Sequence, residues 1–225
     1  MASKNKNDIL LMTQARLGST RIPNKMLRPF AGTTLLDILL EKLTKIKSIP
    51  QSNIYVSAYE DEIKDVIGKY NLNIFHRSKK SANAEEDASS ILEFHDKLPF
   101  KYVIGVIACH PLLKVDTIEK FINHSINSVK EGVFAVFKKK TYYWNKDGKM
   151  ITNWGDNKIM NTKYIDPVYE AAHCLGCSRM DIIKDGYYID NKLPLEPDLF
   201  VMDELEAFDI DYEWQFKLGE KLWKK

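Results

Sequence analysis

The sequence has few cysteines and no long apolar run. Three cysteines among 225 residues cannot all pair in disulfides, which favours a reducing compartment. No apolar stretch approaches the roughly 20 residues needed to cross a bilayer. The residues before the first apolar run lack the hydrophobic core of a signal peptide. We therefore expect a cytoplasmic protein that does not associate with membranes.

An excess of either charge is also missing. The chain carries 33 cationic and 31 anionic side chains, for a net charge of +2, which gives no basis for general nucleic-acid binding. Basic and aromatic residues occur together in 138–144, but no further basic patch supports a nucleic-acid surface there. A hydrophobic content of 44% suffices for one good core. We expect a single domain spanning 1–225, with 138–166 as an extension.

Short apolar runs alternate with amphipathic stretches. The expected strands are 8–12, 53–57, 73–75, 101–108 and 132–137. The expected helices are 33–47, capped by Thr33 or Thr34, and 61–70, 91–98, 115–129 and 212–223. This alternation predicts a mostly parallel α/β sheet, in which ligands bind beyond the carboxyl ends of the strands.

A basic loop, residues 13–25, directly follows the first expected strand. Gly18 allows a ligand to approach the backbone, and the amides around Ser19 and Thr20 can bind an anion. The cations Arg16, Arg21 and Lys25 suit a triphosphate. With one glycine, the loop fits neither the Walker pattern nor the dinucleotide fingerprint. The alternative is a basic surface turn without function.

The order Ala15-Arg16-x-Gly18-Ser19-Thr20-Arg21-x-Pro23-x-Lys25 resembles the N-terminal signature of the cytidylyltransferases that make CMP-activated sugar acids. This family includes CMP-N-acylneuraminate synthetase, CMP-Kdo synthetase and spore-coat polysaccharide synthesis proteins. The resemblance implies a three-layer, Rossmann-like nucleotidyltransferase fold. It also implies that the loop wraps CTP, with Ala15, Arg16, Gly18, Ser19, Thr20, Arg21 and Lys25 as the binding residues.

A second segment resembles the same family. Asp87-x-x-Ser90-Ile91, with Ser89 inside it, matches the Asp-x-x-Ser-Ser-Ile segment of the acylneuraminate branch in outline, and Arg77 matches the arginine that precedes it. The resemblance implies that Arg77 and one of Ser89 and Ser90 hold the nucleotide. The alternative is a capped helix start, because Asp and Ser are common capping residues.

The chain departs from the family after the expected strand 101–108. Ile107 stands where the acylneuraminate branch has glutamine, and Cys109 stands where other branches have aspartate. His110 can substitute for the missing contact by binding phosphate or substrate. The alternative is a hydrogen-bonded loop histidine.

Two aspartates near the C-terminus suit a hard cation. On an extended strand, Asp209 and Asp211 would point to the same side and could share one ion. An Asp-x-Asp alone is weak evidence, since turns are rich in aspartate. Here it resembles the family's C-terminal Asp-Ile-Asp, which implies that the pair holds the catalytic Mg²⁺.

The region 138–166 contains a turn at 145–148 between aromatic and apolar runs, which predicts a hairpin. In the family, this extension packs against a second subunit, so a homodimer is expected. The resemblance also places Lys163 and Tyr169 near the substrate. Cys174 and Cys177 could bind zinc or form a disulfide, but buried thiols are favoured because no second ligand pair follows.

Together these features predict a Mg²⁺-dependent enzyme that transfers CMP from CTP to a small sugar acid and releases pyrophosphate. Its catalytic residues would be Arg16, Lys25, Asp209 and Asp211. Three alternatives stay open: another acceptor such as a phosphonate or sugar phosphate, a sugar-nucleotide glycosyltransferase with an Asp-x-Asp metal site, and a catalytically impaired nucleotide-binding homologue.

Overall fold

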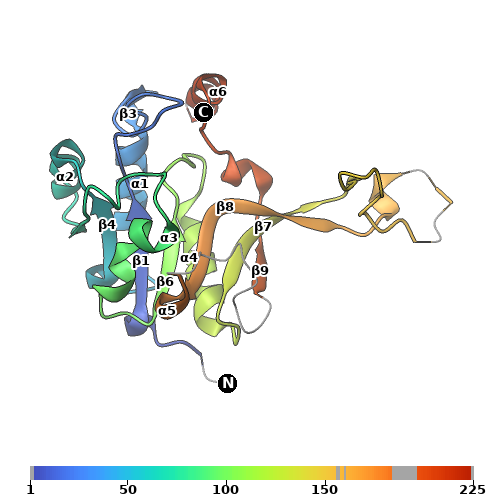
Figure 1. The fold of residues 1–225 in the computed structure, drawn as a ribbon, viewed down its shortest axis with the longest axis horizontal. Coiled ribbons are helices and arrows are strands. Elements are labelled where there is room, and N and C mark those ends of the chain that lie inside the picture. Colours follow the sequence, from blue (N-terminus) through green and yellow to red (C-terminus); the bar gives the residue numbers. More distant parts are fainter. Residues whose placement is uncertain (1–2, 156–157, 160, 184–196, 224–225) are drawn as a thin grey trace.

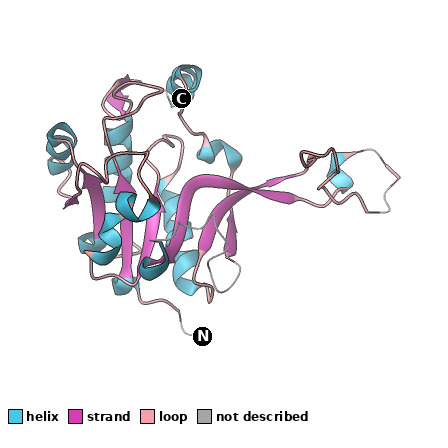
Figure 2. Cartoon of the chain, viewed as in Figure 1, coloured by secondary structure: helices cyan, strands magenta, loops and turns pink. Residues whose placement is uncertain are grey.

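The structure, a computed structural model, describes residues 3–155, 158–159, 161–183 and 197–223. They form a seven-stranded sheet with helices on both faces (Figures 1 and 2). The strands, in their order across the sheet, are β5 (Asn73–His76), β4 (Ile54–Ala58), β1 (Ile9–Gln14), β6 (Tyr102–Val106), β8 (Val168–Arg179), β7 (Val133–Lys139) and β9 (Asp198–Val201). β8 runs antiparallel to both of its neighbours, while β5, β4, β1 and β6 pair in parallel. The predicted three-layer, mostly parallel α/β fold is confirmed.

The helices are α1 (Leu35–Thr44), α2 (Asp61–Gly68), α3 (Ala88–Ile91), α4 (Val115–Asn127), α5 (Met180–Ile183) and α6 (Glu213–Trp223), and a small second sheet pairs β2 (Pro29–Phe30) with β3 (Thr33–Thr34). Alternate residues of β1 supply the two faces of the main sheet. Ile9 and Leu11 join the larger core with α1, α2 and α4. Leu10 and Met12 join a smaller core beside α3 and α5. This alternation of side chains across a strand makes β1 the centre of both cores.

The predicted start of α1 is confirmed, because the Thr34 side chain accepts a hydrogen bond from the amide of Asp37 at 3.0 Å. The predicted helix 91–98 is wrong: a 3-10 turn, Glu93–Asp96, follows α3. The carbonyl of Ile91 accepts bonds from the side chains of Gln14 and Ser81. The His95 amide bonds instead to Leu92, three residues back, so an α-helix does not continue.

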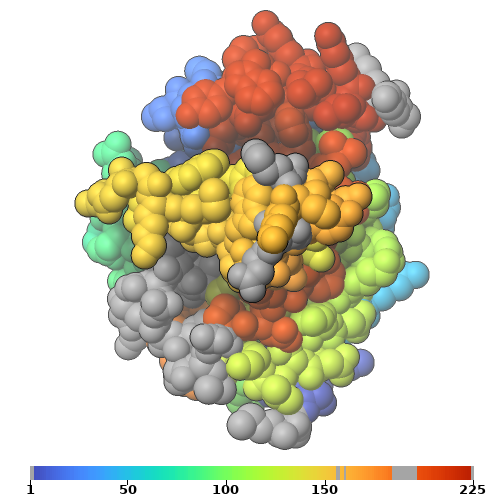
Figure 3. Space-filling model, turned by 90° about the vertical axis from the view of Figure 1, so that its right-hand side faces the viewer, coloured from blue at the N-terminus to red at the C-terminus, as the bar shows by residue number. Residues whose placement is uncertain are grey.

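β7 and β8 continue beyond the body of the sheet as a long ribbon (Figure 1). We call this ribbon, together with the residues that connect its two strands, the arm. Figure 3 views the arm end-on, in front of the sheet edge. The predicted hairpin turn is confirmed, because the Gly148 amide bonds to the Asn145 carbonyl at 3.1 Å and Trp144 pairs with Met150 across it. Residues 156, 157 and 160 of the predicted extension lie outside the described residues.

A bulge interrupts the pairing of β8 with β7 at the base of this arm. Phe134 pairs with Gly176 and Val136 with Ala171, so one residue of β7 faces four residues of β8. Within the bulge, His173 has φ of 54°, in the left-handed region that few non-glycine residues adopt. The bulge redirects β8 beside the end of β6.

Among the described residues, none of the helices combines the length and apolar character required to span a membrane.

Candidate active site

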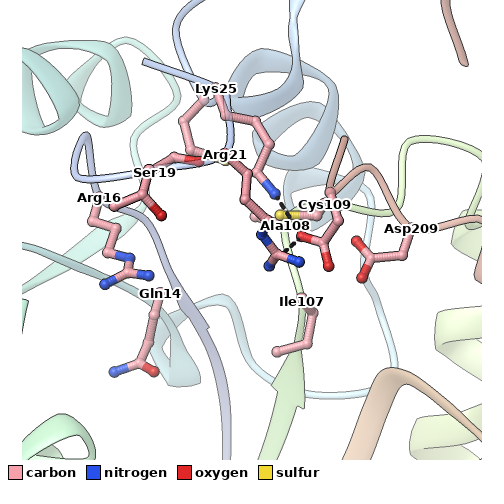
Figure 4. Close-up of a pocket in the computed structure, with 12 residues that line it drawn as sticks. Gln14, Arg16, Ser19, Arg21, Lys25, Ile107, Ala108, Cys109 and Asp209 are labelled. Atoms are coloured by element: carbon pink, nitrogen blue, oxygen red, sulfur yellow. Dashed lines mark hydrogen bonds and ion pairs between the residues drawn. The ribbon is translucent and has the colours of Figure 1, made fainter. Parts of the chain in front are cut away.

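A cleft of about 320 Å³ lies beyond the carboxyl ends of β1 and β6 (Figure 4). Three segments meet there: the loop after β1, residues 107–109 after β6, and the C-terminal segment before α6. The lining residues are Gln14, Arg16, Ser19, Thr20, Arg21, Lys25, Met26, Ile107, Ala108, Cys109, Asp209 and Asp211. The location agrees with the rule that open α/β sheets bind ligands at the ends of their parallel strands.

The basic loop is fixed at its second half. Ile22 and Met26 are buried in the larger core, and the Asn24 carbonyl accepts bonds from the amides of Leu27 and Arg28 at 2.9 Å. Asn24 has φ of 53°, a conformation that asparagine tolerates better than most residues. These anchors leave the side chains of the first half free to face the cleft.

Two cations of the loop converge on one carboxylate. Asp211 Oδ1 lies 2.8 Å from Arg21 Nη2 and 3.2 Å from Lys25 Nζ. Lys25 is buried and also donates to the Ile210 carbonyl at 2.5 Å. Burial alone would lower the pKa of Lys25, but contacts with the Cys109 thiol and Asp211 outweigh it, so the pKa is raised. Lys25 therefore stays charged at the centre of the cleft.

Asp209 has no such partner. Its Oδ1 is buried without a hydrogen-bond partner. Burial, followed by repulsion from Asp211, raises the pKa of Asp209, and the nearby Lys25, Arg21 and His173 partly oppose this shift. A buried, unpaired carboxylate oxygen beside a second carboxylate is a good site for a divalent cation, which would supply the missing partner.

In the described part of the chain, no three His, Cys, Asp or Glu side chains are grouped as a metal site would need. Asp209 and Asp211 would therefore hold a cation together with oxygens from water or a phosphorylated ligand. That donor set fits Mg²⁺, which commonly uses one or two carboxylates and the oxygens of bound phosphates.

The predicted pair is not on a strand, which corrects the expectation. Asp209 and Asp211 lie in the irregular segment between the 3-10 turn Glu204–Ala207 and α6. The segment is tied to the end of β6 by a hydrogen bond from the Ile210 amide to the Cys109 carbonyl at 3.0 Å. Because Ile210 is fully buried between them, both carboxylates still line the cleft.

Helix α6 holds this segment against the basic loop. Arg28 makes a bidentate ion pair with Glu213, at 2.7 and 2.8 Å. Phe30 and Phe216 pack edge to face, with ring centroids 5.1 Å apart. A β-carbon on Gly219 would come within 3.0 Å of Ile210 Cδ1, so a glycine allows the helix to approach this closely. The N- and C-terminal parts of the chain therefore form the site together (Figure 1).

A second cavity of about 300 Å³ adjoins the cleft. It is lined by Gln14, Arg16, Arg77, Ser81, Ala82, Asn83, Ala84, Ile91 and Ile107, three of which also line the cleft. Arg77 is buried and donates to the Ala15 carbonyl at 2.6 Å. Burial lowers the pKa of Arg77 to about 10. Arg77 thus clamps the start of the basic loop and forms one wall of the second cavity.

Several residues predicted for nucleotide binding do not line either cavity. Ala15 is buried, and its contribution is the carbonyl held by Arg77. Gly18 has an ordinary φ, and a β-carbon there would meet open space. Ser89 is exposed, and the Ser90 amide donates to Asp87 at 2.8 Å, which matches the capped helix start considered as the alternative.

The residues predicted for the substrate are dispersed. His110 is buried behind the cleft, and burial lowers its pKa to about 4, so it is neutral at pH 7. Lys163 lies on the arm, where its ammonium stacks on Tyr164. Tyr169 is exposed on β8, paired with Lys138 in the ribbon. None of the three lines either cavity.

Cys174 and Cys177 are fully buried in β8, which confirms their predicted burial. Burial raises the pKa of the Cys177 thiol to about 11 and that of the Cys174 thiol to about 12. Both therefore behave as apolar groups of the core.

Sequence reasoning missed two residues that shape the site. Gln14 lines both cavities and donates to Ile91 at 2.8 Å. Glu60 accepts a bond from the Leu17 amide at 3.0 Å and fixes the first half of the basic loop. Both lie at the carboxyl end of a parallel strand, β1 or β4. Their position at the carboxyl ends of expected parallel strands is the sequence feature that could have identified them.

Comparison with known proteins identifies the family. A family model described as cytidylyltransferase matches residues 10–173, more than half of the chain. The chain belongs to the cytidylyltransferase family. The predicted family is thus confirmed, and the protein is a nucleotidyltransferase of the type that transfers CMP. The matched region of this cytidylyltransferase includes the basic loop and residues 107–109 of the cleft.

Two relatives of this cytidylyltransferase differ in coverage. Post-translational flagellin modification protein B of Campylobacter coli is 25% identical, over 97% of this chain and 96% of that protein. The 3-deoxy-manno-octulosonate cytidylyltransferase of Francisella tularensis subsp. holarctica is 28% identical, over 60% of this chain and 52% of that protein. Similarity to the first runs over nearly its full length.

Solved structures share the fold of this cytidylyltransferase. CMP:2-keto-3-deoxy-manno-octonic acid synthetase in complex with CTP superposes with a TM-score of 0.68 at 10% identity, covering 96% of this chain and 98% of that one. The 4-diphosphocytidyl-2C-methyl-D-erythritol synthase of Anaerococcus prevotii gives 0.66 at 15% identity, covering 98% and 97%. At these identities the likeness establishes the fold.

Proposed function

We propose that the protein transfers CMP from CTP to a small sugar acid, with release of pyrophosphate, in the synthesis of a surface polysaccharide or glycoconjugate. The observation that carries the proposal is the convergence of Arg21 and Lys25 on Asp211, beside the unpaired carboxylate of Asp209. Such a cleft offers cations for phosphates and carboxylates for a metal. The name of the Francisella relative, a 3-deoxy-manno-octulosonate cytidylyltransferase, supports an acceptor of the sugar-acid class.

The triphosphate would lie on the basic loop. Arg16, Arg21 and Lys25 supply charge, and Ser19 and Thr20 line the same wall. The second cavity would hold the cytosine, because it adjoins the cleft and is partly enclosed by Arg77 and residues 81–84. The side chains of Gln14 and Arg16 face both cavities and would contact the nucleotide between base and phosphates.

Asp209 and Asp211 would hold Mg²⁺, which neutralises charge on nucleotide oxygens when bound. The protein's own contribution is orientation and charge. Attack and departure at a transferring phosphoryl group are roughly in line, so the acceptor hydroxyl approaches from the side opposite the pyrophosphate. Lys25 and Arg21 would stabilise the negative charge on the departing pyrophosphate. Because these groups are held in place before the reaction, less free energy is needed to reorganise them as the transition state forms.

Coupled detection of pyrophosphate tests the proposal. Purified protein is incubated with CTP, Mg²⁺ and one member of a panel of sugar acids, sugar phosphates or phosphonates. Release that depends on a sugar acid, with formation of the CMP conjugate, supports the proposal. Release with a phosphonate or sugar phosphate alone would favour the other acceptors. CTP binding without turnover on any acceptor would favour an impaired homologue, and turnover of a sugar nucleotide would favour a glycosyltransferase.

A homodimer formed through the arm is part of the proposal. Trp144 is 54% exposed and Ile151 61% exposed. Both belong to the arm, which extends away from the body of the sheet (Figure 1). Tyr142 stacks on Trp154 with ring centroids 5.2 Å apart, which gives the arm a small core of its own. Isolated hairpins are marginal without further packing, so a second copy of the chain would stabilise the arm.

A further inference from the structure

A buried lysine on α1 contacts the turn that follows β6. Lys42 is 8% exposed, and its ammonium donates to the carbonyl of Pro111 and to that of His110, the latter at 3.5 Å. These two carbonyls come directly after Cys109, which lines the cleft. The Cys109 carbonyl accepts the bond from the Ile210 amide at 3.0 Å. Lys42 therefore holds this turn at the point where residues 209–211, the acidic segment of the cleft, are attached to it.

The same ammonium also interacts with elements on both sides of the acidic segment. Lys42 Nζ lies 5.5 Å from the ring centre of Trp223, the last residue of α6, which is within the range of a cation–π interaction. Glu206 attracts the ammonium from the 3-10 turn before the acidic segment. Glu206 is buried and is fixed there by the side chain and the amide of Lys114, at 2.9 and 3.0 Å. One cation thus links α1, the turn after β6, the 3-10 turn and α6.

A buried ammonium at this place is unfavourable unless its charge has a use. Burial lowers the pKa of Lys42 to about 8, and attraction to Glu206 opposes only part of this shift. A methionine has a similar length and would avoid the cost of burying a charge. Replacing a buried ion by an apolar side chain of similar volume is often neutral or stabilising. The contacts that the charge makes therefore explain a lysine at position 42 better than stability does.

The charged groups near Lys42 keep one state between pH 7 and pH 9. Burial raises the pKa of Glu206, but hydrogen bonds, including those from Lys114, outweigh it and the pKa is lowered. The bond to Glu206 raises the pKa of Lys114 in turn. His110 is neutral above pH 7, because burial lowers its pKa to about 4. Trp223 carries no charge. In this pH range the change of charge at this junction therefore belongs to Lys42.

We propose that Lys42 is a positioning residue for the transfer reaction: its positive charge holds the turn after β6 and the end of α6 so that the acidic segment stays in the cleft, and loss of that charge at alkaline pH releases the segment. This inference rests on the proposed function. Lys42 does not line the cleft and would not touch the substrates. The basic loop is anchored separately, through buried Ile22 and Met26, so its contacts with a nucleotide should persist when the charge is lost.

Titration calorimetry with CTP, with and without Mg²⁺, tests the role of Lys42. The measured quantity is the gain in CTP affinity that Mg²⁺ produces, which depends on the acidic segment if that segment holds the metal. Wild type and Lys42→Met are compared at pH 7 and pH 9. Lys45→Met is the matched control, because Lys45 is exposed at the end of the same helix. The affinity for CTP without Mg²⁺ shows whether each variant keeps its basic loop, and kcat with a sugar acid is measured at the same pH values.

At pH 7, Lys42→Met should reduce both the gain from Mg²⁺ and kcat about tenfold, because charge-assisted bonds and a cation–π contact are lost. Its CTP affinity without Mg²⁺ should not change. The gain for wild type should fall toward the Lys42→Met value at pH 9, whereas Lys42→Met should change little with pH and Lys45→Met should behave as wild type.

Two results would overturn the positioning role. The first is a wild-type gain from Mg²⁺ in Lys42→Met, or a gain that falls with pH in this variant as it does in wild type. The second is an equal loss of CTP affinity with and without Mg²⁺, which would show a general loss of structure. Absence of turnover on every sugar acid would instead overturn the proposed function, and the calorimetric comparison would still decide the role of Lys42.

Discussion

Arg21 Nη2 lies 2.8 Å from Asp211 Oδ1, so a loop cation is paired with a carboxylate that would bind the metal. Lys25 shares the same oxygen at 3.2 Å. When a nucleotide and Mg²⁺ bind, these cations would exchange a carboxylate for phosphate oxygens. The two carboxylates of the pair therefore differ: Asp211 is paired in the free protein, whereas Asp209 Oδ1 has no partner. We therefore expect substitutions of Asp209 and of Asp211 to change the stability of the free protein differently.

Asp209→Asn should lower turnover to less than a tenth of the wild-type rate, a loss above roughly 1.4 kcal/mol. The melting temperature of the nucleotide-free variant at pH 7 should be unchanged or higher, because the substitution removes the charge of a half-buried carboxylate that Asp211 repels and whose Oδ1 has no hydrogen-bond partner. Asp211→Asn should also lose activity but melt at a lower temperature, since Lys25 would lose its ion pair. Scanning calorimetry and pyrophosphate release measure both. Substantial activity of Asp209→Asn would remove Asp209 from the metal site.

Lys25→Ala should weaken CTP binding about ten- to a hundred-fold and change CMP binding little. A charge-assisted contact to the β- or γ-phosphate is worth roughly 1.5–3 kcal/mol, and CMP lacks both phosphates. Titration calorimetry with each nucleotide gives the two affinities. The exposed Lys217 on α6 provides the matched control, Lys217→Ala, which should bind CTP normally. Equal losses for CTP and CMP would place Lys25 at the α-phosphate or the base.

Much of the site could be predicted from sequence, for a local reason. The basic loop and the two aspartates are short segments, and their charged side chains line the cleft themselves. Their chemistry can therefore be predicted from residue type without knowledge of the fold. The clamp between Arg77 and the Ala15 carbonyl depends instead on contact between residues 62 positions apart. The end of helix α3 at Ile91 likewise involves a distant residue, because Gln14 on β1 donates a hydrogen bond to the Ile91 carbonyl. Such long-range competition for a backbone carbonyl leaves no local pattern.

The arm illustrates the same limit. The resemblance places Lys163 and Tyr169 near the substrate; in the structure both lie on the ribbon formed by β7, β8 and their connection, and neither lines the cleft. The bulge that positions His173 arises from the pairing register of two strands. Register cannot be read from β8 alone, because each strand's own alternation is compatible with more than one partner alignment.

The buried His110 should make stability depend on pH. Burial lowers its pKa to about 4 in the folded protein, against about 6.5 when unfolded. Between these values the unfolded state binds more protons, so the free energy of unfolding falls as pH decreases from about 6.5 to 4. Urea titrations across this range should show a shallower fall for His110→Gln than for wild type. His95→Gln should keep the wild-type slope, and a wild-type slope in His110→Gln would show that His110 does not titrate in this way.

Light scattering at micromolar concentration should give twice the chain mass of 26.1 kDa. The exposed apolar residues of the arm motivate this expectation, since aromatic and large apolar side chains are common at interface cores. The double variant Trp144→Ser, Ile151→Ser should shift the mass toward that of one chain. The exposed Trp214→Ser, on α6, is the control. A wild-type monomer would contradict the proposed dimer.

Both carboxylates follow every strand of the sheet in the chain, and they reach the cleft through the Ile210 bond to Cys109 and the packing of Phe216 on Phe30. During translation, the sheet and the basic loop therefore emerge before the acidic half of the site. The carboxylates proposed to hold a metal would therefore join the cations only when α6 docks. Chains that stop before residue 209 would lack both carboxylates and, under the proposed function, would not transfer CMP.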